Sequence, residues 1–141
     1  LVVTIHQDIE KLCTEYSIPV ILHSSPYRND MIRLGLDTIG SYLDRCAFIP
    51  SDQPLIKTES IASLLLCAKN EPSYIWRTCY DKTPGSPVIF PKEYFDELMS
   101  LPQGKGGNVV VHNHESQVRQ LPVTNKTELM DIDTPADMAR L

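Results

Sequence analysis

A carboxylate directly after an apolar run is the first feature of this 141-residue sequence that could do chemistry. Residues 46–49 (Cys-Ala-Phe-Ile) are continuously apolar, which is typical of a strand buried on both faces. Pro50 and Pro54 frame the loop that follows, and Asp52 lies between them. Open α/β sheets bind ligands at the carboxyl ends of their strands, so Asp52 is a candidate metal- or phosphate-handling group. The alternative is that Asp52 only shapes a turn.

A second acidic pair, Asp131-x-Asp133, precedes the last predicted helix. That helix starts with a capping-box pattern from Thr134 to Asp137. Mg²⁺ prefers oxygen ligands and bridges phosphates, so carboxylates from two separate loops are suited to holding it for phosphoryl-type chemistry. The alternative for Asp133 is a favourable interaction with the positive end of the helix.

Two loops have residues suited to a bound anion or a closely approaching ligand. Gly85-Ser86-Pro87 precedes the apolar residues 88–90 and would let a ligand approach the backbone, although it is equally suited to a plain turn. Lys105 lies among glycines, where backbone amides and the ammonium group together favour an anion. The spacing around Lys105 is not that of a Walker loop.

Alternating strands and helices must position these loops. We expect strands at 2–5, 18–22, 46–49, 74–79, 88–90, 118–123 and 128–132, with amphipathic helices between most of them. Thr58 is the expected N-cap of the helix after Asp52. The order β-α-β-α-β-α in the first half predicts an α/β domain with a parallel sheet and right-handed crossovers.

Composition excludes several classes of protein. The net charge of −5 and the pI near 5.3 argue against nucleic-acid and anionic-membrane partners, which require a basic face. No apolar run approaches the roughly 20 residues needed to span a bilayer. The four cysteines form no Cys-x-x-Cys pair and are typical of a reducing compartment, so we predict a cytoplasmic protein.

Four segments in order resemble the MobA-like nucleotidyltransferases, in particular the molybdenum-cofactor cytidylyltransferase branch. They are residues 48–55 (FIPSDQPL), 85–90 (GSPVIF), 105–107 (KGG) and 129–137 (LMDIDTPAD). The resemblance implies a three-layer α/β/α Rossmann-like nucleotidyltransferase fold with a mostly parallel sheet. It also implies an enzyme in which a phosphate of an acceptor attacks the α-phosphate of a nucleoside triphosphate and pyrophosphate leaves.

The resemblance assigns roles to particular residues. Asp52 matches the family's Mg²⁺-binding aspartate, and Asp133 matches a second metal-side carboxylate, so both are predicted to be catalytic. The predicted substrate contacts are Gln53, Pro54, Gly85, Ser86, Pro87, Lys105 and Gly106, of which residues 85–87 match the acceptor-side loop and residues 105–106 a loop that closes over substrate.

The implied partners are a nucleoside triphosphate, CTP rather than GTP, a molybdopterin-type acceptor and a molybdoenzyme client. The family's N-terminal strand and Gly-rich loop have no counterpart here, so residues 1–141 are expected to form a single, N-terminally incomplete domain that is inactive by itself. Two other interpretations stay open: a non-catalytic module that binds nucleotide or molybdenum cofactor, and a sugar-phosphate nucleotidyltransferase of the same fold.

Overall fold

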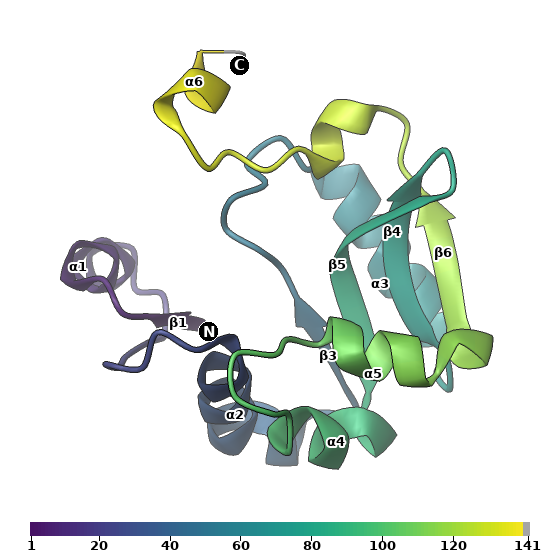
Figure 1. Ribbon diagram of the computed structural model, residues 1–141, viewed down its shortest axis with the longest axis horizontal. Helices are drawn as coiled ribbons and strands as arrows, with labels where there is room; N and C mark the ends of the chain where they lie inside the picture. Colours follow the sequence, from purple (N-terminus) through teal and green to yellow (C-terminus); the bar gives the residue numbers. More distant parts are fainter. Residues whose placement is uncertain (140–141) are drawn as a thin grey trace. The chain divides into compact units, whose positions relative to one another are not determined.

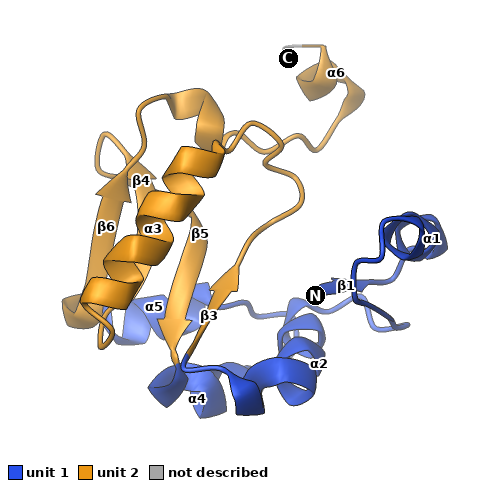
Figure 2. Ribbon diagram, turned by 180° about the vertical axis from the view of Figure 1, so that it is seen from behind, with its two compact units in different colours: residues 1–44, 92–115 blue, residues 45–91, 116–141 orange. Residues whose placement is uncertain are grey.

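The computed structural model describes residues 1–139, which form an α/β protein (Figure 1). The chain divides into two compact units, coloured separately in Figure 2. One unit consists of residues 1–44 and 92–115. The other consists of residues 45–91 and the C-terminal stretch that begins at Ser116.

The first unit has a two-stranded parallel sheet, in which β1 (Val2–Thr4) pairs with β2 (Val20–Leu22). Its other elements are α1 (Gln7–Glu15), α2 (Arg28–Ile39), the 3₁₀ turns η1 (Gly40–Tyr42) and η2 (Lys92–Tyr94), α4 (Phe95–Met99) and α5 (Asn108–Asn113). Helices α2 and α4 pack closely near Gly40, where an added Cβ would lie 3.6 Å from the ring of Phe95.

The second unit has a four-stranded mixed sheet in the order β3-β5-β4-β6. Strand β5 runs antiparallel to both β3 and β4, whereas β4 and β6 are parallel. The elements are β3 (Arg45–Phe48), α3 (Thr58–Asn70), β4 (Ile75–Tyr80), β5 (Thr83–Pro91), β6 (Val118–Pro122), η4 (Lys126–Leu129) and α6 (Pro135–Met138), and η3 (Glu115–Gln117) leads into β6.

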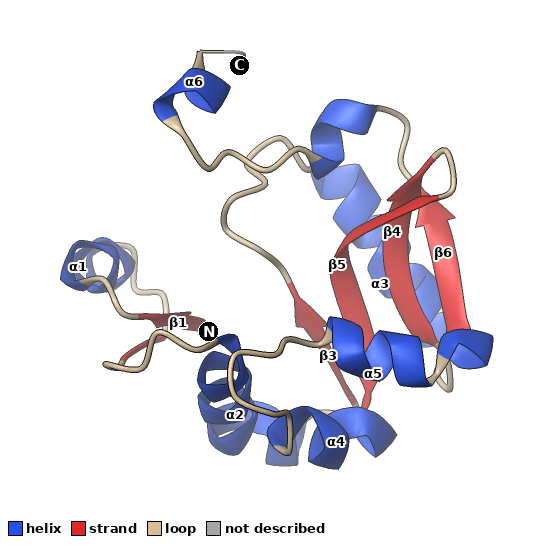
Figure 3. Cartoon of the chain, viewed as in Figure 1, coloured by secondary structure: helices blue, strands red, loops and turns tan. Residues whose placement is uncertain are grey.

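Helix α3 covers one face of this sheet (Figure 3). Its residues Leu64 and Ala68 form a buried cluster with Trp76 of β4 and Ile89 of β5. Side chains alternate along a strand, so the next residue of β4, Arg77, lies on the other face, opposite Val88. This alternation leaves Arg77 on the face that α3 does not cover.

The predicted α/β class is confirmed, and the sheets are parallel in part. A strand at 128–132 was a wrong expectation, because residues 126–129 form the 3₁₀ turn η4. Thr58 is also not an N-cap: helix α3 begins there, but its N-cap is Lys57. The capping box from Thr134 to Asp137 is confirmed.

The four cysteines are unpaired, and Cys13 and Cys79 are buried. Within residues 1–139, no helix combines the length and the apolar character that crossing a membrane requires.

Candidate functional site

Asp52 lies in the turn that follows β3, as its position after an apolar run predicts. Its backbone carbonyl accepts a hydrogen bond of 2.8 Å from the amide of Ile132. One carboxylate oxygen, Oδ1, is buried and has no hydrogen-bond partner in the described part of the chain. A buried carboxylate oxygen without a donor is costly unless a ligand compensates it.

Gln53 links the same turn by a hydrogen bond to the acidic segment before α6. Its side chain is 8% exposed, and Nε2 donates a 2.8 Å hydrogen bond to Oδ1 of Asp131. The other amide atom, Oε1, is buried and accepts no hydrogen bond within residues 1–139. Gln53 therefore has a clear positioning role, and Pro54 beside it is exposed.

The structure brings the two predicted acidic regions together through these bonds. Asp52 and Gln53 lie beside residues 131–132, although 78 positions separate Gln53 from Asp131 in the sequence. Asp133 is exposed and directly precedes Thr134, the N-cap of α6. Asp131 is thus engaged with Gln53, whereas no hydrogen bond or ion pair within the described residues occupies the Asp133 carboxylate.

The predicted acceptor-side loop, Gly85-Ser86-Pro87, is a bulge in the β4–β5 ladder. Arg77 pairs with Val88, and Cys79 pairs with Pro84, so Thr78 alone lies opposite residues 85–87. Such bulges redirect the strand and its side chains, and they occur often beside active sites.

Arg77 and Leu129 hold this bulge from two directions. The carbonyl of Gly85 accepts hydrogen bonds from Nε and Nη2 of Arg77 at 3.1 and 2.9 Å. A Cβ on Gly85 would lie 2.6 Å from Cδ1 of Leu129, so only glycine fits without a shift. Because Leu129 ends η4, the predicted acceptor-side loop packs against the start of the segment that leads through Met130 to the acidic pair.

Lys105 and Gly106 belong to the other unit, and Lys105 is exposed. Their loop is tied to the start of α2: Asn29 Oδ1 accepts a 2.8 Å hydrogen bond from the amide of Gly104, whose φ of 77° is left-handed. Gly106 lies against the side chain of Arg28. Sequence reasoning missed Arg28 and Asn29, since nothing in their spacing relates them to the glycine loop.

The residues around Asp52 fit a hard divalent cation. Asp52 Oδ1 and Gln53 Oε1 are buried oxygens that accept no hydrogen bond within residues 1–139. Both Mg²⁺ and Mn²⁺ prefer oxygen ligands. Within residues 1–139 no cluster of three or more His, Cys, Asp or Glu side chains has metal-binding geometry. A site with one or two carboxylates is sufficient for Mg²⁺, which keeps several waters and binds substrate phosphates.

Residues 1–118 match the family model described as the MobA-like NTP transferase domain. The chain belongs to this family. No curated protein matches the chain.

Solved structures of the same fold cover nearly the whole chain. Rv0371c from Mycobacterium tuberculosis H37Rv is similar with a TM-score of 0.82 at 21% identity, covering 98% of this chain and 71% of that one. Molybdopterin-guanine dinucleotide biosynthesis protein A from Archaeoglobus fulgidus gives 0.69 at 21% identity, with 98% and 74% covered. A cytidylyltransferase from Leptospira borgpetersenii gives 0.72 at 20% identity, with 94% and 60% covered. These likenesses show the nucleotidyltransferase fold of this MobA-like chain.

Proposed function

We propose that this protein transfers a nucleoside monophosphate, CMP from CTP, to a phosphorylated acceptor of the molybdopterin type in a Mg²⁺-dependent reaction. The observation that carries the proposal is the unpartnered, buried Oδ1 of Asp52 in a turn that is bonded to the acidic segment 131–133. Membership of the MobA-like family supports the transferase chemistry.

The named relatives support the choice of substrates and metal. The Archaeoglobus protein is named for molybdopterin-guanine dinucleotide biosynthesis, and the Leptospira protein is a cytidylyltransferase. The Mycobacterium tuberculosis protein has been crystallised in complex with manganese. We carry these properties to the present chain as part of the proposal, with a molybdoenzyme as the client that receives the product.

In the proposed reaction an oxygen of the acceptor phosphate attacks the α-phosphorus of CTP. A new P–O bond forms, the bond from the α-phosphorus to the α–β bridging oxygen breaks, and pyrophosphate leaves with that oxygen. Asp52 and Asp133 would hold the metal, which neutralises charge on the phosphates when bound. Positioning of the two substrates supplies much of the remaining catalysis.

The other predicted residues serve binding and orientation. Gln53 holds Asp131 and so fixes the turn that carries Asp52, and Pro54 continues that turn. The bulge at Gly85, Ser86 and Pro87 provides the backbone surface for the acceptor. Lys105 would add positive charge for a phosphate, with Gly106 allowing the close approach.

Mass spectrometry of the intact gene product incubated with Mg²⁺, molybdopterin and either CTP or GTP tests this proposal. We expect the wild-type protein to form the cytidylylated acceptor with CTP and little product with GTP. In Asp52→Ala we expect the rate of nucleotidyl transfer to fall on the order of 100-fold. Asp37→Ala, a change of an exposed aspartate of α2, is the matched control and should keep the full rate. Full activity of Asp52→Ala would refute the assignment, and preference for GTP would correct the substrate.

A further inference from the structure

Arg77 is a half-buried cation in the middle of β4, on the sheet face that α3 does not cover. Within the described residues its guanidinium forms no ion pair with a carboxylate. Among residues 1–139, its hydrogen bonds are those that Nε and Nη2 donate to the Gly85 carbonyl. Burial lowers the pKa of Arg77, and the neighbouring Cys79 opposes that effect only in part.

A guanidinium in this setting has unused binding capacity. It has five N–H groups in a fixed plane, and the Gly85 carbonyl uses one edge of that plane. Nη1 donates to nothing within residues 1–139. An anion that completes the hydrogen bonds of a partly desolvated cation without a counter-ion stabilises that cation strongly.

The position of Arg77 determines which anion it would meet. The carbonyl that orients the guanidinium belongs to the bulge at 85–87, the loop assigned above to the acceptor. Leu129 fixes Gly85 on its other side, so the guanidinium and the loop are held in one arrangement. An acceptor lying on this loop would bring its phosphate to the remaining edge of the guanidinium.

We propose that Arg77 binds the phosphate monoester of the acceptor while its Nε and Nη2 hold the Gly85 loop in place. The proposal rests on the function proposed above for the choice of acceptor. Phosphate binding by Arg77 itself requires neither nucleotide nor metal, which allows it to be tested separately.

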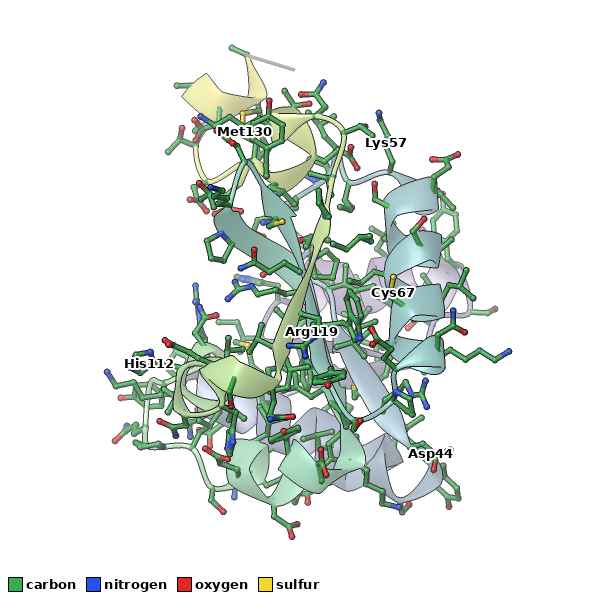
Figure 4. All side chains as sticks on the ribbon, turned by 90° about the vertical axis from the view of Figure 1, so that its right-hand side faces the viewer. Asp44, Lys57, Cys67, His112, Arg119 and Met130 are labelled. Atoms are coloured by element: carbon green, nitrogen blue, oxygen red, sulfur yellow. The ribbon has the colours of Figure 1, made fainter. Side chains whose placement is uncertain are left out.

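Arg119 provides a matched control on the neighbouring strand. Arg119 (labelled in Figure 4) pairs with Trp76 across β4 and β6. Its guanidinium carbon lies 3.8 Å from the centroid of the Tyr74 ring. Since Trp76 packs against α3, Arg119 lies on the opposite face from Arg77. Changing Arg119 removes an equal charge from the same sheet without touching the Gly85 loop.

The test is a titration of the ¹⁵N-labelled intact gene product with inorganic phosphate, observed through the Nε–Hε signals of both arginines. We expect a saturable shift of the Arg77 signal and no saturable shift of Arg119, with chloride at equal ionic strength as reference. Arg77→Gln should weaken phosphate binding by about tenfold or more, as expected for a lost charge-assisted hydrogen bond, and Arg119→Gln should bind like the wild type.

Hydrogen exchange of residues 83–88 separates binding from loop support. Arg77→Lys keeps the charge but not the paired hydrogen bonds, so we expect faster exchange in the loop with phosphate binding retained in part. An Arg77 signal that shifts with chloride as it does with phosphate would overturn the proposal, whether or not the protein transfers nucleotide. Phosphate binding at Arg77 without nucleotidyl transfer would instead uphold this inference and refute the proposed function.

Discussion

At the scale of single residues, the site depends on side chains that hold other residues rather than on the carboxylates alone. Gly85 is the clearest case, because its missing Cβ leaves room for Leu129. The sequence predicts this loop through its glycine and prolines, but the contact that requires the glycine comes from a residue more than forty positions away.

Gly85→Ala should lower the free energy of unfolding by about 1–3 kcal/mol, because the new methyl overlaps the Leu129 side chain. Urea unfolding of the two single variants and of Gly85→Ala with Leu129→Ala measures the coupling. We expect the double variant to be more stable than the sum of the single effects by about 1 kcal/mol. Additive effects on the free energy of unfolding would mean that the contact with Leu129 is not what restricts residue 85 to glycine.

Glu128 is a second residue whose role only the structure shows. Its side chain is 1% exposed and accepts hydrogen bonds from the backbone amide of Lys57 and the hydroxyls of Ser60 and Thr124. Burial by itself raises the pKa of Glu128, but these bonds and the nearby Lys57 ammonium outweigh it, and the pKa lies below its usual value. Glu128 thus ties the start of α3 to η4, although α3 itself has no side-chain cap at its N-cap residue Lys57.

Glu128 should make stability depend on pH in the acid range. Because its pKa is lower in the folded state, its contribution is complete above the unfolded value of about 4.3 and is lost as pH falls through the folded pKa. Urea unfolding between pH 7 and pH 3 should show a smaller acid loss in Glu128→Gln than in the wild type. At pH 7 the variant should be less stable by about 1.5–3 kcal/mol. Parallel pH profiles of the two proteins would contradict this role.

At the scale of elements, apolar periodicity and turn residues predict most of the helices and strands. The structure contains the strand that precedes Asp52, the helix that begins at Thr58 and the capped helix that begins at Pro135. The direction of strand pairing was less accessible, since the antiparallel β3–β5 and β4–β5 ladders depend on contacts between distant segments. Residues 128–132 have the composition of a strand, yet the buried Glu128 bonds instead to Lys57 and Ser60 at the start of α3.

The glycine loop around Lys105 offers a prediction at this scale. Asn29→Ala removes the acceptor of the Gly104 amide and should raise hydrogen exchange at Gly104 by about fivefold, in line with a bond of about 1 kcal/mol. Exchange in the body of α2 should not change. Asn70→Ala, at the last residue of α3, serves as control. Unchanged exchange at Gly104 would show that Asn29 does not hold this loop.

At the scale of the whole molecule, two segments that are far apart in sequence lie together, as the proposed cation site requires. The pattern of residues suggested that Asp52 and the 131–133 segment act together, and the family resemblance strengthened that expectation. The bonds from Ile132 to Asp52 and from Gln53 to Asp131 supply the physical link. That Asp131, rather than Asp133, pairs with Gln53 was not predictable, because residues two positions apart in an extended segment share a face and the sequence does not distinguish them.

The most direct test adds substoichiometric Mn²⁺ to the ¹⁵N-labelled intact gene product and measures paramagnetic broadening of its amide signals. One shared cation predicts that residues 51–53 and 131–133 broaden together, and that both effects disappear in Asp52→Asn but persist in Asp37→Asn. Broadening confined to one of the two segments, or unchanged by Asp52→Asn, would contradict a metal site built from both.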